Sequence, residues 1–574
     1  MYLRFTQRAN ADGSLVRYVA LAHNRRVEGQ TRPDVLMNLG RVDRLDVDGL
    51  RRLADSINRH FGGHDGLGDA AEAGLATGAA PMEVLDSRPI GASWLLDGLW
   101  RGLRIDASLR SIADGRRFTT DVERVVFALV ANRAIAPMSK LSAAEWVSED
   151  VVIPGLSGMD EDQAYRAMDL LVEADAQARV QEAVFFAVAN LLNLEVDLLF
   201  FDTTSTYFER DDEEGTDAED GATQGFRRYG KSKDHRDDLP QIVIGLAVTR
   251  EGIPVRVWCW PGNTNDQSVL AQVRDDLRDW KLGRVITVVD RGFSSADNLA
   301  YLRRAGGHYI AGMRMRDGNA LVEQVLSRQG RYQQVRDNLR VKEVKIEAAG
   351  DQRFIICHNP DQATRDAAQR DTAIARIEAE LQRIAKQRER DRAKDPKSRD
   401  KAEAAHVKAE CELREHPTLG RWLRQLKSGR LVIDRAKVAA EQRLDGKYLL
   451  ATSDPHISAE DTALGYKNLL EAERGFRDMK STLLLRPVFH RLERRIRAHV
   501  LICWLALLLT RVAERQTEQT WRRIERETSR LAQITLAGEA GTVTQTTPLR
   551  PTQKAIYQAL SIQPPPRVSA FNPT

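Results

Sequence analysis

The spacing of hydrophobic and polar residues changes several times along the chain, and each change predicts a different kind of element. Residues 1–45 alternate apolar and polar positions around a turn at 12–14, which predicts a small β-meander. Residues 46–61 have helical spacing, and a stretch rich in Gly, Ala and Asp follows, which predicts a linker over about 64–87. From 88 to 194 the apolar positions recur every three or four residues, so this region is expected to be helical.

Two short apolar runs further along predict neighbouring strands of a buried sheet. Val196–Phe201 ends at Asp202, and Arg284–Val289 ends at Asp290. An alternating hairpin pattern over 242–260 lies between them. A carboxylate at the end of a buried strand can hold a metal ion, although a single Asp at such a position is more often only a turn former. Two strands of the same type, each ending in Asp, suggest one sheet with both carboxylates close together.

The region from 316 to 460 has a different character. Short strand-like runs flank two charged helical stretches, Asp366–Arg392 and Lys401–Glu415, which Asp395-Pro396 separates. This pattern predicts an antiparallel helical hairpin, which we interpret as a solvated arm without a catalytic part. The longest apolar run, Val500–Leu509, is shorter than the roughly 20 residues that a membrane-spanning helix needs, so it predicts a buried helix.

Charge is concentrated in particular segments rather than spread as a global excess. The 574 residues are 29% charged, yet the formal net charge is only +4. Between Arg421 and Lys447 there are eight Lys or Arg against three Asp or Glu, and between Arg474 and Arg515 there are ten against three. Such clusters are typical of a surface that follows phosphates, but ordinary basic surface helices would give the same counts.

Basic residues also fall at the ends of the helices predicted between 88 and 194, namely Arg116, Arg117, Arg133 and Lys140. A helical region with basic loops is compatible with DNA binding, although it shows no helix-turn-helix signature. The four cysteines form no C-x-x-C pair, which argues against a zinc knuckle or a disulfide framework and fits a reducing, cytosolic compartment. The N-terminus has no apolar signal core.

The stretch Tyr466–Lys480 carries three chemically distinct side chains at a regular spacing. Tyr466, Glu473 and Lys480 are seven residues apart, which is two helical turns each time. On one continuous helix they would project from the same face. A solvated helix face with one aromatic residue would show the same spacing.

Asp202, Asp290 and Glu473 together suggest a phosphoryl-transfer site. Two divalent ions that lie about 3.5–4 Å apart need a bridging carboxylate and further private ligands. Mg²⁺ suits such a site because it keeps several waters and takes few protein carboxylates. Lys480 and Tyr466 would then contact a backbone phosphate beside the metal ions.

These residues resemble the DDE triad of bacterial insertion-sequence transposases of the cut-and-paste subgroup, which have a Tyr-x2-Arg-x3-Glu-x6-Lys signature. Tyr466, Glu473 and Lys480 match that signature, whereas Leu469 stands at the Arg position; Arg474 or Arg477 would have to replace that phosphate contact. The resemblance covers nine segments between about Asn132 and His499: NRAIAPMSKLSAAEW, FFDTTSTYF, YGKSKDHRDDLPQ, EGIPV, PGNTND, VVDRGFSS, DGKYLLATSD, AERGFRDMKSTLLLRPVFH and RIRAH.

The resemblance implies an α/β fold in which an RNase H-like mixed sheet is flanked by helices and interrupted by a β-rich insertion domain with a helical hairpin. A mainly helical N-terminal region would bind DNA. The implied domains are a small β/α module (1–63), a linker (64–87), the helical DNA-binding region (88–194), the first part of the core (195–315), the insertion domain (316–460), the second part of the core (461–530) and a C-terminal tail (531–574).

The resemblance also implies roles for individual residues. Asp202, Asp290 and Glu473 would be catalytic and would bind Mg²⁺, with Mn²⁺ able to substitute. The residues expected to contact DNA are Tyr466, Lys480, Arg474, Arg477, Tyr448, Arg486, Arg494 and His499. Tyr448 occupies a position where a relative has Trp, so it would stack on a flipped base; a Tyr of the hydrophobic core is the alternative. For Ser232, Lys233, His235 and Arg236, phosphate contact and bracing of the adjacent hairpin are both open.

The implied function is that of a transposase. It would bind the terminal inverted repeats of its element as a homodimer, cleave double-stranded DNA at the ends and join the 3′ hydroxyl to target DNA. The protein would be cytoplasmic and associated with the nucleoid, and it would have no membrane partner. Two alternatives remain: an RNase H-like endonuclease without strand transfer, and a catalytically silent DNA-binding remnant.

Overall fold

The alternating residues at the N-terminus form an antiparallel three-stranded sheet in the computed structural model, as predicted. Its strands are β1 (Tyr2–Ala9), β2 (Leu15–Val27) and β3 (Gln30–Arg41). The sheet belongs to a unit made of Met1–Glu83, Leu536–Thr542 and Pro573–Thr574, and the rest of the chain forms a second unit.

The structure describes residues 2–9, 15–27, 30–45, 47, 82–113, 121–172, 176–192, 197–209, 225–278, 280, 285–316, 318–393 and 395–573. The helix predicted over 46–61, apart from Val47, lies outside these residues, as do Arg116, Arg117 and most of the predicted linker. The linker's last residues are part of a strand, β4 (Glu83–Pro89), rather than linker.

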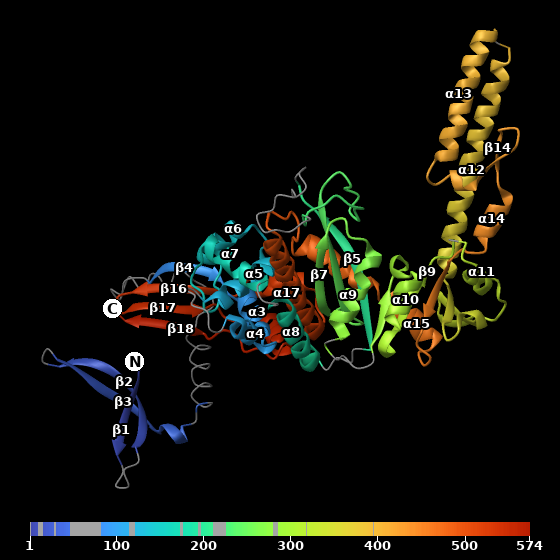
Figure 1. Cartoon of the computed structure of the whole chain (residues 1–574). Helices are drawn as coiled ribbons and strands as arrows, with labels where there is room; N and C mark the ends of the chain where they lie inside the picture. Colours follow the sequence, from blue (N-terminus) through green and yellow to red (C-terminus); the bar gives the residue numbers. More distant parts are fainter. Residues whose placement is uncertain are drawn as a thin grey trace. The chain divides into compact units, whose positions relative to one another are not determined.

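A nine-stranded mixed sheet lies at the centre of the second unit (Figure 1). The strand order is β10-β11-β12-β15-β9-β8-β5-β6-β7, and β8 runs parallel to both of its neighbours, β5 and β9, while the other pairs are antiparallel. The strands, in chain order, are β5 (Leu198–Tyr207), β6 (Gln241–Thr249), β7 (Pro254–Pro261), β8 (Ile286–Val289), β9 (His308–Met313), β10 (Gln333–Arg336), β11 (Leu339–Lys345), β12 (Arg353–His358) and β15 (Lys447–Thr452).

Both faces of the central strands are buried, which explains why they read as continuous apolar runs rather than as alternating ones. Phe200 and Val288 belong to the hydrophobic cluster on one face, and Phe201 and Val289 belong to the cluster on the other. Helices α9 (Asp266–Arg278) and α10 (Ala296–Leu302) contribute to the second cluster.

The strands between the second Asp and Glu473 do not form a separate domain, which corrects the prediction of an insertion domain over 316–460. β15 pairs with β9, and β12, β11 and β10 follow it, so these strands extend the central sheet. The pairing satisfies the backbone of β9, which would otherwise be an edge strand. On the second face Phe354 and Leu449 join the same cluster as Phe201.

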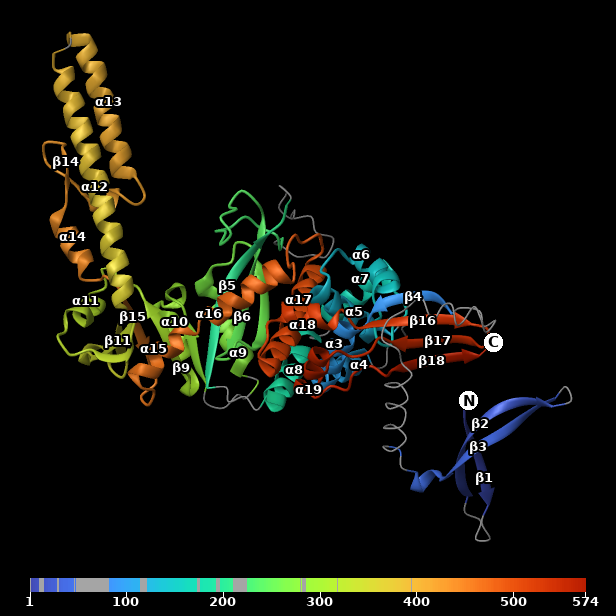
Figure 2. The ribbon, with the colours of Figure 1, turned by 180° about the vertical axis from the view of Figure 1, so that it is seen from behind.

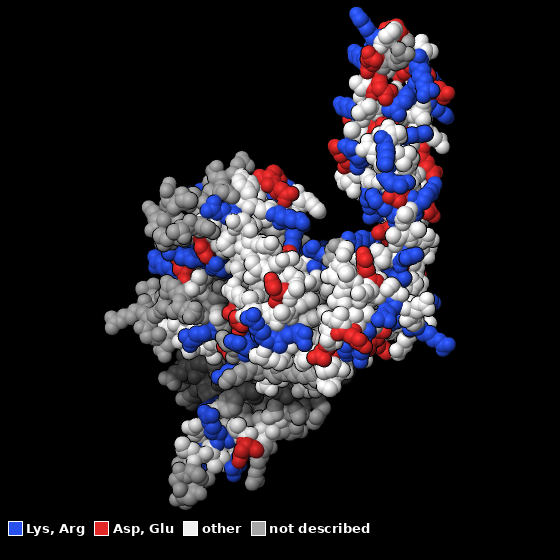
Figure 3. All heavy atoms as spheres, turned by 45° about the vertical axis from the view of Figure 1, so that its right-hand side comes forward, with Lys and Arg blue, Asp and Glu red and all other residues white. Residues whose placement is uncertain are grey.

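The predicted helical hairpin is present, and it is the part of this region that stands apart from the sheet (Figure 2). Its helices are α12 (Pro360–Asp391) and α13 (Pro396–Glu415), and the strands β13 (Leu423–Gln425) and β14 (Leu431–Ile433) and helix α14 (Arg435–Gln442) follow. The hairpin has a small core of its own that includes Ile377, Leu413 and Trp422. Figure 3 shows acidic and basic side chains intermixed along it, as expected for a solvated arm.

The helices predicted between 88 and 194 share one core with the sheet and with helix α17 (Glu493–Thr517), which packs against α5, α7 and β7. These helices are α3 (Gly91–Gly102), α4 (Ile105–Ala113), α5 (Val122–Ile135), α6 (Lys140–Glu145), α7 (Glu161–Val172) and α8 (Ala176–Leu192). The region is therefore not a separate module. Within the described part of the chain, α17 has the length and apolar composition of a membrane span, yet 94% of its most apolar window is buried inside the protein, so it is the buried helix that the sequence predicts.

The last residues are folded rather than forming the predicted tail. Helices α18 (Trp521–Thr528) and α19 (Pro551–Ala559) and strands β16 (Ala532–Gly538), β17 (Gly541–Thr546) and β18 (Val568–Pro573) follow α17. The three strands form a sheet with β4. Tyr557 is buried, and its hydroxyl donates to the carbonyl oxygen of Gly91, which ties α19 to α3.

Candidate active site

Asp202 and Asp290 lie next to each other on two central strands of the sheet. Asp290 directly follows β8, as predicted, but Asp202 lies within β5, which continues to Tyr207 instead of ending at the Asp. β5 and β8 are parallel, and Phe201 is directly opposite Val289. The residue that follows each of them is an Asp, so the two carboxylates occupy the same position on adjacent strands, which are about 4.8 Å apart in any sheet. Both residues are half-buried.

Asp202 has an unusual electrostatic environment. Burial raises the pKa of its carboxyl group to about 6, and the negative charges of Asp290 and Asp266 add to this increase. The ammonium group of Lys233 and the backbone N–H of Thr203, which donates to Asp202, act in the opposite direction. The raised pKa of Asp202 is therefore mainly an effect of its burial, with a smaller contribution from the two neighbouring carboxylates.

Asp266, the first residue of α9, is a further carboxylate at this site. It accepts a hydrogen bond from Thr203 Oγ1 (2.6 Å), and Lys233 Nζ lies 3.0 Å from its other oxygen. Lys233 Nζ also donates to the carbonyl oxygen of Thr203 (2.8 Å), and its backbone N–H donates to Ser205 Oγ (2.8 Å). These contacts hold the loop of Lys233 against β5, beside Asp202.

Tyr466 reaches the site from helix α15 (Ala459–Lys467), on which it lies. Its hydroxyl donates to Asp290 Oδ1 (2.7 Å), and burial together with Asp290 raises the pKa of this phenol. The ring stacks on Tyr448 with 6.0 Å between centroids. A Cβ at Gly312 of β9 would lie 2.3 Å from the Tyr466 hydroxyl, so only glycine leaves room for this approach.

Lys480 faces the same site but is held by an acidic side chain. Its Nζ donates to Thr204 Oγ1 (2.7 Å) and lies 3.0 Å from Asp234. Arg486 lies 2.9 Å from the other oxygen of Asp234. Burial lowers the pKa of Lys480, and Asp234 opposes that effect. Asp234 therefore acts as an internal anion for two residues that the sequence assigns to phosphate binding.

Glu473 lies on helix α16 (Leu470–Arg477), which packs against β5 and β6. Gly475 of this helix faces Leu246 of β6, and Leu246 is directly opposite Asp202. The helix thus crosses the sheet at the level of Asp202. The Glu473 side chain itself is exposed. Among the described residues no group of three His, Cys, Asp or Glu side chains lies close enough to hold a metal ion, so Asp202 and Asp290 come together without Glu473.

The single continuous helix expected over Tyr466–Lys480 is wrong. α15 ends at Lys467, α16 begins at Leu470, and the π-helix η8 (Asp478–Thr482) contains Lys480. Hydrogen bonds between residues three apart tighten the chain between α15 and α16, including Asn468 N–H to Gly465 O and Leu469 N–H to Tyr466 O. Leu469, which stands at the arginine position of the signature, lies at this break and is buried in the hydrophobic core.

The other predicted DNA contacts differ in their surroundings. Arg477 and Arg494 are exposed, and Arg494 pairs with Asp169 (3.2 Å). Arg474 points toward Glu514 (3.7 Å). His499 was predicted to contact DNA, but it is buried at 3% exposure, and its Nε2 bonds to the carbonyl oxygen of Leu485 (3.0 Å), so it does not lie on the exposed surface. It stands at the start of the apolar run of α17, which buries it.

Sequence reasoning missed Asp234 and Asp266, and it left the role of Lys233 open. Both carboxylates lie within the motif segments YGKSKDHRDDLPQ and PGNTND. Those segments carried a signal, since they resemble family motifs, but neither spacing nor composition indicates that they fold back against β5. Ser232 and Arg236 brace the same loop: Ser232 N–H donates to Asp237 (2.6 Å), and Arg236 pairs with Asp238 (2.8 Å).

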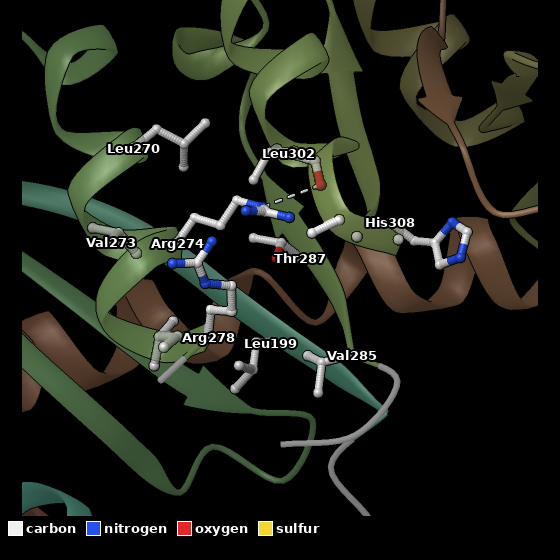
Figure 4. A pocket seen from close by; sticks show the side chains of 13 residues that line it. Leu199, Leu270, Val273, Arg274, Arg278, Val285, Thr287, Leu302 and His308 are labelled. Atoms are coloured by element: carbon white, nitrogen blue, oxygen red, sulfur yellow. Dashed lines mark hydrogen bonds between the residues drawn. The ribbon is translucent and has the colours of Figure 1, made fainter. Parts of the chain in front are cut away.

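A cavity of about 410 Å³ lies at the opposite ends of the same parallel strands (Figure 4). Leu199, Thr287 and His308 line it from the beginnings of β5, β8 and β9. The side chain of Arg274 crosses the cavity and donates to the carbonyl oxygen of Leu302 (3.3 Å). None of the three predicted catalytic carboxylates lines this cavity, so it is separate from the candidate active site.

Two family models match the chain. Residues 198–509 match the family of the transposase DDE domain, and residues 3–69 match the N-terminal domain of IS1634 family transposases. No curated protein matches the chain. Among solved structures, the cryo-EM structure of a piggyBac transposase synaptic complex with hairpin DNA is similar, with 11% sequence identity, a TM-score of 0.36, and coverage of 75% of this chain and 79% of that chain.

Proposed function

The chain belongs to the DDE transposase family, and on that premise we propose that it binds the terminal inverted repeats of its insertion sequence, cleaves DNA at the element ends and joins the freed 3′ hydroxyl to target DNA. The observation that carries this proposal is the pair of carboxylates, Asp202 and Asp290, on adjacent parallel strands, with Tyr466 and the Lys480–Arg486 pair at the same site. The antiparallel strands β7-β6-β5 followed by the parallel β8 and β9 support the RNase H-like core that the resemblance implies.

The chemistry of the donor set fits a divalent cation. Asp202 and Asp290 lie side by side on adjacent strands with Asp266 close to Asp202, and carboxylate oxygens are the ligands that Mg²⁺ prefers. We assign Asp202, Asp290 and Glu473 as the ligands, with Mg²⁺ as the preferred ion and Mn²⁺ as a substitute. When bound, the ions supply activation of the attacking hydroxyl and stabilisation of the leaving oxygen.

Glu473 must move for this assignment to hold. Its helix already crosses β6 at the level of Asp202, and its side chain is exposed, so it is free to change rotamer without breaking a packed contact of its own. We propose that Glu473 turns toward the two Asp residues when DNA and the cation bind.

The remaining side chains orient the substrate. Tyr466 holds the Asp290 carboxylate through a hydrogen bond, and Lys480 and Arg486 bind backbone phosphates after exchanging Asp234 for them. Exposed Arg477 and Arg494, together with Arg474, extend the positive surface. Tyr448 stacks on an unpaired base, the helices between 88 and 194 bind the repeat, and two protomers pair two ends.

Cleavage assays on the full chain test the proposal. The substrates are duplexes taken from the DNA that flanks its gene, with Mg²⁺ added. We expect D202N, D290N and E473Q each to abolish cleavage while DNA binding is retained, and D297N, which changes an exposed carboxylate on α10, to cleave like the wild type.

A second assay separates strand transfer from simple cleavage. Pre-cleaved ends with a free 3′ hydroxyl are offered together with a target plasmid, and joined products are expected. Cleavage without joining would identify an endonuclease. Full cleavage by all three variants would remove the triad, and absence of cleavage by the wild type on every flanking duplex would indicate a silent remnant.

A further inference from the structure

Two motif segments that are far apart in the sequence meet around a small cavity outside the candidate active site. Arg133 and Lys140 come from the end of α5 and the start of α6, and His490 and His499 come from the loop before α17 and from α17 itself. The four side chains line a cavity of about 130 Å³, which we call the basic pocket. The sequence singled out both segments, but the proposed catalytic scheme uses none of these four side chains.

The basic side chains of this pocket are buried, and several of their polar atoms have no partner. Lys140 is 4% exposed and, among the described residues, makes no hydrogen bond or ion pair. Arg133 donates to the carbonyl oxygens of Leu484 and Met138, yet its Nε is buried without a partner in the described structure. The same holds for Nδ1 of His499. Leaving such groups buried and unsatisfied is costly, so they are normally paired.

No acidic residue belongs to the described lining of the basic pocket. Asp169 of the adjacent helix α7 is already engaged by Arg494 and Arg495, both at 3.2 Å. Arg495 also lies over the ring of Tyr165, which lines the pocket, and so adds positive charge on that side. The pocket therefore combines excess positive charge with unused hydrogen-bonding atoms, a combination that suits a bound anion.

The electrostatics agree with this geometry. Burial, together with the charge of Arg133, lowers the pKa of Lys140 to about 7. Burial, with Lys140 and Arg133, likewise lowers the pKa of His490 to about 3. Each basic group thus weakens the protonation of the others, and an anion among them would reverse that effect.

The size and rim of the basic pocket indicate which kind of anion fits. At about 130 Å³ it is smaller than pockets for whole small molecules, which span roughly 300–1,000 Å³. It has room for a compact oxyanion. Phe489 and Leu141, which also line it, are 71% and 62% exposed. An exposed aromatic ring beside a phosphate site is a platform on which a nucleic-acid base can stack.

The loop between η8 and α17 connects the basic pocket to the candidate active site. Arg486 in this loop reaches Asp234, while Pro487, Phe489 and His490 line the pocket. A DNA strand that follows the loop would therefore meet Lys480 and Arg486 first and the pocket next.

We propose that the basic pocket binds one phosphate group of the DNA backbone, with the adjacent base stacked on Phe489. The proposal rests on the proposed function, because it takes the DNA held at the active site as the source of the phosphate. The chemistry that the pocket recognises, a compact phosphate oxyanion, is the same for DNA and for free inorganic phosphate, so the two are tested separately.

The first experiment needs neither DNA nor a divalent cation, and its outcome is independent of catalysis. Thermal unfolding of the full chain is followed in increasing inorganic phosphate and in chloride at equal ionic strength. We expect a saturable rise in Tm with phosphate for the wild type. K140M and the second variant K140Q should lose this rise and should unfold at a higher temperature than the wild type in chloride, because they remove a buried charge. K408M, which changes a 79% exposed lysine on α13, should respond like the wild type.

The second experiment uses a duplex that carries an element end, without divalent metal, over a range of salt concentrations. K140M should bind less tightly, and the slope of log affinity against log salt should fall by about one. F489A should bind less tightly with an unchanged phosphate response, whereas F489Y should retain the affinity.

Two results would overturn the proposal. The anion site is excluded if the wild type gains no more stability from phosphate than from chloride, or if both Lys140 variants keep the phosphate response. If that response is lost while DNA affinity and its salt dependence stay unchanged, the assignment to DNA is wrong. Loss of cleavage activity by itself would concern the proposed function and not the pocket.

Discussion

The candidate active site and the basic pocket differ in whether their basic side chains have acidic partners. At the active site Lys233 pairs with Asp266, and both Lys480 and Arg486 pair with Asp234. In the basic pocket the described lining offers Lys140 and Arg133 no acid. In the first region these cations already have acidic partners, so phosphate binding has to exchange one anion for another. In the second region the buried basic groups have no acidic partner, which costs free energy that a bound anion would recover.

Removing Asp234 should make the active site resemble the basic pocket, and it has the largest expected effect. D234A leaves Lys480, whose side chain is 11% exposed, and Arg486 without their shared carboxylate. Breaking a buried ion pair in this way should lower the free energy of unfolding by about 3 kcal/mol. Denaturant titration measures the loss.

The control for this prediction lies four residues further along the same loop. Asp238 also pairs with an arginine, but its side chain is 63% exposed. D238A should change stability by less than about 0.5 kcal/mol. Equal effects of D234A and D238A would show that Asp234 does not hold the site together.

The second prediction concerns pH and has an intermediate magnitude. In the unfolded chain Lys140 keeps its proton up to about pH 10.4, whereas in the folded chain it loses the proton near a pKa of about 7. Between these values the unfolded state binds more protons, so stability rises with pH, by at most about 1.4 kcal/mol per pH unit. We expect a gain of about 2 kcal/mol from this residue between about pH 7.5 and 9.5.

Subtracting the pH profile of K140M isolates this contribution. The other titratable groups that face Lys140 are Arg133, His490, His499 and Cys503, and all of them remain in the variant. The two histidines have lowered pKa values, so they act below this pH window. Parallel profiles for wild type and K140M would contradict a buried, unpaired Lys140.

Supplying the missing acid should make the basic pocket resemble the active site, with the smallest expected effect. L141E places a carboxylate at the rim, in the first turn of α6, where the helix dipole also favours it. We expect stability to increase by about 1 kcal/mol and the Tm response to phosphate to disappear. L141Q has the same shape without the charge, so its Tm should still rise with phosphate. If L141E and L141Q respond to phosphate alike, the pocket does not recognise the anion by its charge.

The two Asp residues could be predicted from the sequence because the information is local. An apolar run that stops at an Asp indicates a strand, and parallel neighbours bring the two Asp residues side by side. The predicted end is correct for β8, whereas β5 continues through Asp202 to Tyr207. The N-terminal meander and the helical hairpin were predictable for the same reason. Glu473 was assigned from spacing on a helix, and that spacing says nothing about the direction in which its side chain points.

The errors arise where packing overrides local pattern. The expected helix through Tyr466 and Lys480 is interrupted between α15 and α16, although the residues on both sides favour helix. The strands of the expected insertion domain joined the central sheet, and the expected tail folded, because pairing partners far along the chain were available. The basic pocket combines residues about 350 positions apart, and only the fold brings them together.

Helix α17 has a consequence for how the polypeptide is made. It completes the core of α5 and α7, yet it leaves the ribosome about 300 residues after α8. At usual elongation rates that interval lasts roughly 15–60 s. During this interval the apolar surfaces of α5 and α7 that α17 later covers stay exposed. The nascent transposase therefore depends on chaperones or on slowly folding, loosely packed intermediates. A product truncated before residue 493 cannot cover these surfaces.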